Sequence, residues 1–121
     1  MAYPAYSVKY DKSNPTKMYS KAYKMIDKGQ YSKAQKILKN YTKSEPEDPD
    51  GWTLLAFTYR KLEKFTESEE SYLKALNLEP DNKSALEYQG ELFIETNRID
   101  LAKANIKKLQ NLCPNSCEEL E

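Results

Sequence analysis

The two cysteines of this 121-residue chain, Cys113 and Cys117, carry its most reactive side chains. Their C-x-x-x-C spacing differs from the C-x-x-C of thioredoxin-like redox motifs. A short stretch around a proline can bring two cysteine Cα atoms within the ~4.4–6.8 Å that a disulfide needs. The spacing also allows a reduced thiol pair, or a four-thiolate metal site shared by two copies of the chain. We expect the disulfide and keep both alternatives open, including a redox- or metal-responsive role.

Histidine is absent from the chain, and this absence excludes several kinds of active site. Ser-His-Asp and Cys-His catalytic pairs need an imidazole base, and many zinc sites use imidazole ligands. Carboxylates are plentiful, but none is predicted to lie in an apolar pocket that would shift its pKa. We therefore predict no enzymatic activity, no metal site within one chain and no cofactor.

Charge is distributed unevenly along the chain although the net charge is zero. Residues 1–43 hold ten lysines against two acids, a balance of +8, and residues 44–121 hold nine bases against seventeen acids, a balance of −8. Four lysines share one predicted helix face by their three- and four-residue spacing: Lys17, Lys21, Lys24 and Lys28. Such a face could bind nucleic acid, but seven nearby acids oppose it: Glu45, Glu47, Asp48, Asp50, Glu67, Glu69 and Glu70. We therefore expect no nucleic-acid ligand.

A 34-residue period runs through the chain. Prolines recur at Pro46, Pro80 and Pro114. Apolar and small residues recur in the same phase, in the series Met18/Trp52/Leu86, Ala22/Ala56/Gly90, Met25/Tyr59/Phe93, Ala34/Ser68/Ala102 and Leu38/Tyr72/Ile106. Six positions in phase over three periods, with no insertion, are not expected by chance.

Each period contains two apolar faces at helical spacing, separated by a short break. In the middle period, Trp52, Ala56 and Tyr59 form the first face, and Tyr72 and Ala75 belong to the second. One such helix pair cannot bury its apolar face alone, but three stacked pairs can. We predict an all-α fold with six helices near residues 15–28, 31–44, 49–62, 65–78, 83–96 and 99–111.

The period and these residues resemble the tetratricopeptide repeat, a 34-residue helix-turn-helix unit. The resemblance implies a right-handed α-solenoid of three repeats at residues 15–48, 49–82 and 83–116. A tyrosine-rich arm (1–14) precedes the repeats and a short tail (117–121) follows them. Tyr41 and Leu109 stand where Ala75 shows the usual small residue, so we expect the first junction, at Tyr41, to be splayed or repacked.

The resemblance also implies where a ligand would bind, because the first helices of successive repeats in this family line a concave, peptide-binding groove. The aligned groove positions are Tyr19, Tyr23, Ile26, Thr53, Phe57, Arg60, Lys61, Glu87, Tyr88 and Glu91. Tyrosine and arginine are enriched at binding hot spots. We therefore predict a non-enzymatic scaffold that binds a protein or peptide, with self-association through the uncapped end or the N-terminal arm as a further use.

Some members of the family hold the C-terminal carboxylates of heat-shock chaperones with a clamp of lysine, asparagine and arginine. The aligned positions of this chain carry none of those residues and hold Tyr19, Tyr23, Leu54, Ser84 and Tyr88. We therefore do not expect that class of ligand.

The chain is also similar to a group of small exported alphaproteobacterial proteins of this family. The similarity rests on Asn14-Pro15, on the helix Leu-Glu-Tyr-Gln-Gly-Glu-Leu (86–92) and on the ending Leu-Cys-x-x-x-Cys-Glu-Glu (112–119). It implies a mature exported or periplasmic protein whose signal peptide has been removed, and in that compartment a Cys113–Cys117 disulfide is stable. A cytoplasmic location is the alternative. No apolar run approaches ~18 residues, so we expect no membrane span.

Overall fold

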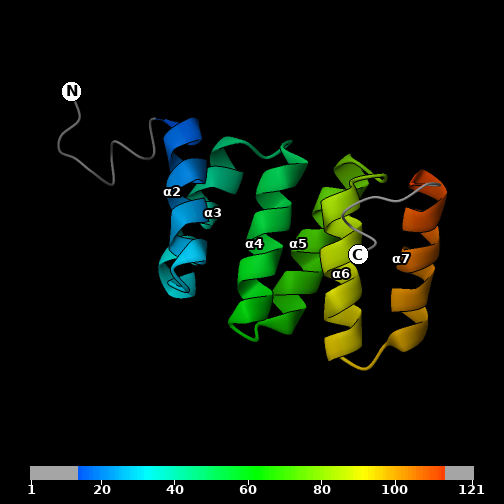
Figure 1. Ribbon diagram of the computed structural model, residues 1–121. Coiled ribbons are helices and arrows are strands. Elements are labelled where there is room, and N and C mark those ends of the chain that lie inside the picture. Colours follow the sequence, from blue (N-terminus) through cyan, green and yellow to red (C-terminus); the bar gives the residue numbers. More distant parts are fainter. Residues whose placement is uncertain (1–13, 114–121) are drawn as a thin grey trace.

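The computed structural model describes residues 14–113, which form six helices arranged as three helix-turn-helix pairs (Figure 1). The helices are α2 (Pro15–Asp27), α3 (Tyr31–Ser44), α4 (Pro49–Lys61), α5 (Phe65–Leu78), α6 (Lys83–Glu95) and α7 (Ile99–Leu112). The predicted all-α fold is confirmed, and every predicted helix boundary falls within one residue of the observed one. The predicted C-terminal tail and nearly all of the predicted N-terminal arm lie outside the described residues.

The first helix of each repeat begins with a side-chain cap. Asn14, Asp48 and Asn82 accept hydrogen bonds from the backbone N–H groups of Lys17, Asp50 and Ala85, at 3.2, 2.9 and 2.8 Å. Short polar side chains are favoured at this position because they satisfy N–H groups that have no partner within the helix. The period thus fixes where α2, α4 and α6 start.

The second helix of each repeat follows a tight turn instead of a side-chain cap. The turns place Gly29, Glu63 and Asn97 in the left-handed region, with φ values of 74°, 61° and 62°. These three residues are separated by 34 positions, so the same turn recurs in each repeat. Glycine and asparagine tolerate this conformation well, whereas glutamate pays a steric cost.

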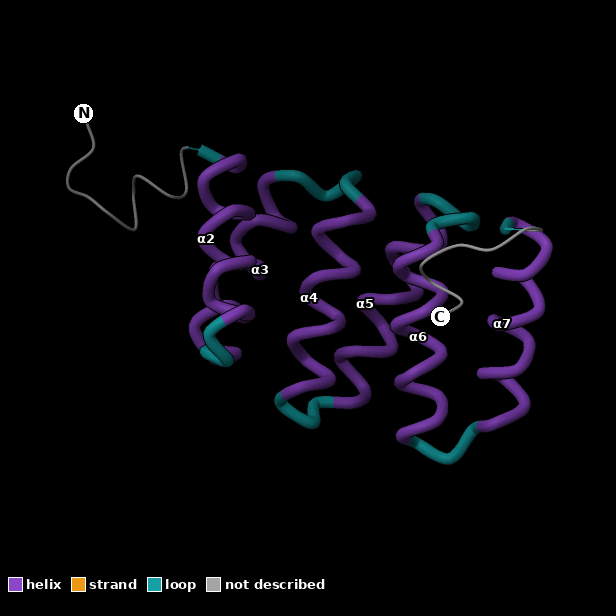
Figure 2. Tube along the Cα trace, in the orientation of Figure 1, coloured by secondary structure: helices purple, strands orange, loops and turns teal. Residues whose placement is uncertain are grey.

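The helices lie in two layers. In Figures 1 and 2 the first helices α2, α4 and α6 follow one another across the molecule, and α3 and α5 lie behind them. Each first helix packs against the second helix of its own repeat, and α4 and α6 also pack against the second helix of the preceding repeat. A direct contact between α4 and α6 adds to the second junction.

Most residues of the recurring apolar and small series are buried, Met25 and Trp52 are partly buried, and one residue is exposed. Ala22, Ala56, Leu38 and Tyr72 are fully buried, but Ile106, which is equivalent to Leu38 and Tyr72, is 44% exposed. In the second repeat this position is covered by α6 of the next repeat, whereas no helix of the described residues follows α7. Ile106 therefore keeps the spacing of its series but not the burial of Leu38 and Tyr72.

The first junction is repacked around Tyr41. The Tyr41 ring is buried and lies beside Gly51, where a Cβ atom would be only 2.6 and 2.8 Å from two ring carbons. Its hydroxyl donates a hydrogen bond to the Asp48 carboxylate, and its ring lies 5.4 Å from that of Tyr19. At the next junction the equivalent positions hold two alanines, Ala75 and Ala85. At the first junction a tyrosine and a glycine therefore stand where the second junction has two alanines.

Candidate functional site

An ordered aromatic pair joins α4 to α6 on the layer of first helices. The rings of Phe57 and Tyr88 meet edge-on, with centroids 5.3 Å apart and planes inclined by 62°. The Lys61 ammonium lies 5.5 Å from the Phe57 centroid and the Arg60 guanidinium lies 5.4 Å from it. Cations at this distance are attracted to an aromatic face, so the ring is held in place before any ligand arrives. We call Phe57, Lys61 and Tyr88 the aromatic platform.

Arg60 serves the junction between repeats. Its side chain is only 10% exposed, and its two terminal nitrogens donate to Glu91 at 2.9 Å and to Glu95 at 3.0 Å. Both glutamates belong to α6, so the guanidinium ties α4 to α6. The charges of Arg60 and Glu91, which we predicted to face a ligand, largely satisfy each other.

Three other predicted groove residues are also engaged in packing. Thr53 is only 5% exposed, and its hydroxyl donates to the Pro49 carbonyl at 2.8 Å. Ile26 packs against the core cluster of the first repeat. Tyr19 is partly buried against Tyr41. The remaining predicted positions are more accessible, with Tyr23 53% exposed, Lys61 exposed and Glu87 partly exposed.

The packed tyrosines predict alkaline instability. Burial, together with Asp50 and Asp48, raises the pKa of Tyr19 to about 12, and burial and the hydrogen bond to Asp48 raise the pKa of Tyr41 still further. An unfolded tyrosine ionises near about 10. Because the folded protein holds these protons more tightly, their contribution to stability is complete below about pH 10 and is lost as the pH rises through the folded values.

We therefore expect the urea midpoint of unfolding to fall from about pH 10 upward, and tyrosinate absorbance to appear together with unfolding. The variant Tyr41→Phe should show a shallower fall than the wild type over the same range. Equal slopes for the two proteins would contradict the role given to Tyr41. The variant Tyr23→Phe, at an exposed phenol, serves as the control.

Of the two cysteines, only Cys113 lies within the described residues. Cys113 ends α7, is buried, and donates its backbone N–H to the Leu109 carbonyl at 2.8 Å. Cys117 lies outside the described residues, so the Cys113–Cys117 bond stays a prediction. Within residues 14–113 no group of three or more acidic or cysteine side chains is placed to hold a metal ion. No helix in that range is long and apolar enough to cross a membrane.

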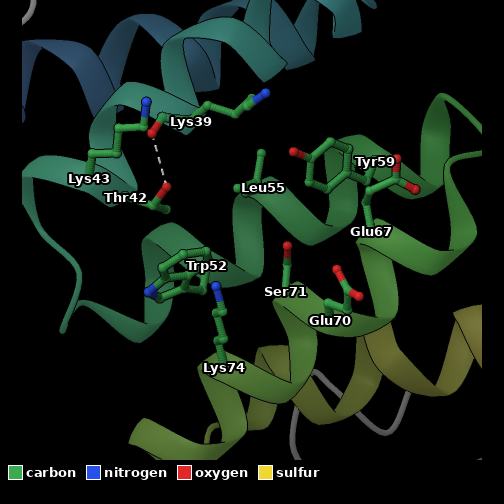
Figure 3. A pocket seen from close by; sticks show the side chains of 10 residues that line it. All are labelled: Lys39, Thr42, Lys43, Trp52, Leu55, Tyr59, Glu67, Glu70, Ser71 and Lys74. Atoms are coloured by element: carbon green, nitrogen blue, oxygen red, sulfur yellow. Dashed lines mark hydrogen bonds between the residues drawn. The ribbon is translucent and has the colours of Figure 1, made fainter.

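A pocket that the sequence did not reveal lies on the opposite side of α4 from the aromatic platform. It opens between α3 and α5, has a volume of about 230 Å³, and has Trp52, Leu55 and Tyr59 of α4 among its lining residues (Figure 3). Periodicity placed Trp52 and Tyr59 on one apolar helix face, and only their place between two second helices shows that they line an opening.

Comparison with known proteins identifies the repeat. Residues 49–82 match the family model described as "Tetratricopeptide repeat". Over 62 residues the chain is 37% identical to human peptidyl-prolyl cis-trans isomerase FKBP4, a match that covers 51% of this chain and 14% of the isomerase. Because so little of the isomerase is covered, its activity is not carried over to this chain.

Solved structures show the same fold. The first TPR domain of Spaghetti (RPAP3), bound to the HSP90 peptide SRMEEVD, superposes with a TM-score of 0.81 and 22% identity, covering 88% of this chain and 85% of that one. The Arabidopsis OM64 TPR domain superposes with a TM-score of 0.81 and 18% identity, covering 91% of this chain and 90% of that one. The Yersinia enterocolitica type III secretion translocator chaperone SycD superposes with a TM-score of 0.80 and 16% identity, covering 88% of this chain and 80% of that one. At these identities the similarity establishes the fold alone.

Proposed function

We propose that this chain, which matches the tetratricopeptide-repeat model over residues 49–82 and has the fold of such domains, is a non-enzymatic module that binds a protein or peptide across α4 and α6. The observation that carries the proposal is the aromatic platform, in which Phe57 is ordered by Tyr88 and Lys61 before binding. Ordered aromatic side chains lose little conformational entropy when a ligand covers them. They are also the side chains most often found at hot spots.

The platform favours a ligand with an apolar or aromatic anchor. Such a side chain would cover the Phe57 and Tyr88 rings, and Lys61 would pair with an acidic group next to it. Peptide binding by proteins of this fold supports the proposal, since the RPAP3 structure contains a bound peptide. The absence of the chaperone-binding clamp residues points to a different peptide sequence.

The test begins with a phage-displayed library of random dodecapeptides selected on the immobilised protein. The affinities of the enriched peptides are then measured by fluorescence anisotropy for wild type, Phe57→Ala and Leu73→Ala. Leu73 is a matched control because it is 50% exposed on α5, in the other layer of helices. We expect Phe57→Ala to weaken binding by more than about tenfold, the size typical of a hot spot, and Leu73→Ala to leave it unchanged.

Circular dichroism of both variants would verify that the helices remain folded. Selection of no peptide, or equal binding by Phe57→Ala and wild type, would overturn the proposal. Export of the chain, its relation to the alphaproteobacterial group and the Cys113–Cys117 bond stay predictions from the sequence. A redox or metal function for the cysteines gains no support from the described residues.

A further inference from the structure

The pocket between α3 and α5 has an apolar floor and charged walls. Trp52, Leu55 and Tyr59 project from α4 into the space between the two second helices (Figure 3). By helical spacing these residues lie on the opposite face of α4 from Phe57 and Lys61. The pocket is therefore separate from the aromatic platform, and a ligand can bind to either one without the other.

The α3 wall of the pocket is basic, and the α5 wall carries a net negative charge. Lys39 and Lys43 come from α3, and Glu67, Glu70 and Lys74 come from α5, where the Lys74 ammonium lies over the Trp52 ring. Within residues 14–113, Lys39 and Lys43 form no ion pair with either of the two glutamates. Burial is the main reason that the pKa of Tyr59 is raised, and the negative charges of Glu67 and Glu70 add to it. The two glutamates thus act on the pocket floor and form no ion pair with the lysines of α3.

The equivalent positions at the next junction hold hydrogen-bonded side chains. Asn105 of α7 stands where α5 has Ser71, and its amide donates to the Leu86 carbonyl at 3.1 Å and to Gln89 Oε1 at 2.9 Å. Gln89 in turn stands where α4 has Leu55. A pair of hydrogen-bonded amides therefore stands at these two positions in the third repeat, whereas in the second repeat a serine and a leucine line the pocket.

We propose that this pocket is a docking site for a partner protein segment in which one apolar side chain lies between an acidic and a basic residue. The apolar side chain covers the floor of Trp52, Leu55 and Tyr59. The acidic residue pairs with Lys39 and Lys43, and the basic residue pairs with Glu67 and Glu70. A volume of about 230 Å³ accommodates one large side chain, and the charges on the two walls set the pattern of its neighbours.

Trp52 supplies the readout, since it is the chain's one tryptophan and lines the pocket, with the Lys74 ammonium 4.4 Å from its ring centroid. The probe is a synthetic peptide with a central leucine, two aspartates before it and two lysines after it. Two control peptides carry only lysines or only aspartates around the same leucine. We expect the mixed peptide to shift Trp52 emission at the lowest concentration, with an effect that weakens as salt is added.

Two variants test the two parts of the proposal. Ser71→Asn, which copies the third repeat, should fill the pocket and weaken the mixed peptide by about tenfold or more. Lys39→Glu combined with Lys43→Glu should weaken it by about tenfold, as expected for two surface ion pairs, and should make the all-lysine peptide the preferred ligand. Both lysines are exposed, so this double variant should fold normally.

Phe57→Ala should leave the Trp52 response unchanged, which separates a failure here from a failure of the proposed function. The proposal is overturned if the mixed peptide leaves Trp52 emission unchanged up to about 1 mM, because a dissociation constant above that concentration is too weak for specific binding. It is also overturned if all three peptides bind equally, or if the lysine double variant keeps the wild-type preference.

Discussion

Replacing Tyr72 with alanine is expected to lower the free energy of unfolding by about 3–5 kcal/mol, the range measured for truncating large buried side chains. Tyr72 of α5 is fully buried and forms one cluster with Ala56 of α4 and Leu92 of α6. Its truncation leaves a cavity at a place where three helices meet. Because Tyr88 packs against the same cluster, we also expect the aromatic platform to lose order.

Two further variants show that the expected loss comes from burial. The Tyr72 hydroxyl is buried and interacts with the Arg60 guanidinium without a hydrogen bond of normal geometry, so Tyr72→Phe should change stability by less than about 1 kcal/mol. Ile106→Ala alters the equivalent position of the third repeat, which is largely exposed, and should cost less than about 1 kcal/mol. Urea unfolding followed by circular dichroism measures all three. A loss at Ile106 as large as that at Tyr72 would contradict the exposure of the α7 outer face.

The series Leu38, Tyr72 and Ile106 shows what periodicity can predict. A period of 34 residues with two apolar faces predicts the helices, because local spacing alone decides which residues share a helix face. Burial at the end of an array depends on whether another helix follows, and the period treats every repeat alike. The period therefore places Leu38, Tyr72 and Ile106 at equivalent positions, but only the first two are buried.

The candidate site was less predictable than the fold. Alignment with the repeat pattern placed Phe57, Lys61 and Tyr88 on the layer of first helices, where the structure forms the platform. It could not show that Arg60 pairs with Glu91 and Glu95, because those partners are 31 and 35 residues away and meet only when α4 packs against α6. Pairing of this kind depends on helix placement and not on spacing within one helix.

The pocket between α3 and α5 was unpredictable for a related reason. Its charged residues lie on two different second helices, and either set alone resembles an ordinary solvated helix face. The next junction differs at two lining positions, because Asn105 and Gln89 form a hydrogen bond where this pocket has Ser71 and Leu55. A comparison of equivalent positions becomes informative only after the structure shows which of them line a junction.

Gly51→Ala is expected to destabilise the protein by about 1–3 kcal/mol, as overpacking of a buried site does. In an exposed helix interior the same change would stabilise by up to about 1 kcal/mol. Here the new Cβ would lie 2.6 and 2.8 Å from the Tyr41 ring, and that ring is restrained by its hydrogen bond to Asp48 and by the neighbouring Tyr19 ring. Urea unfolding of the variant measures the loss.

Gly90→Ala is the matched control, because Gly90 is also a buried helical glycine but the nearest atom to its added Cβ is Asn105 Cβ at 3.9 Å. That separation is an ordinary contact, so Gly90→Ala should keep or raise the stability. The double variant Tyr41→Ala/Gly51→Ala recreates the two alanines of the second junction. It should therefore cost at least about 1 kcal/mol less than the sum of the two single changes. Additive losses would mean that Tyr41 and Gly51 act independently. The Tyr41 ring would then not depend on the missing side chain at Gly51 for its place in the first junction.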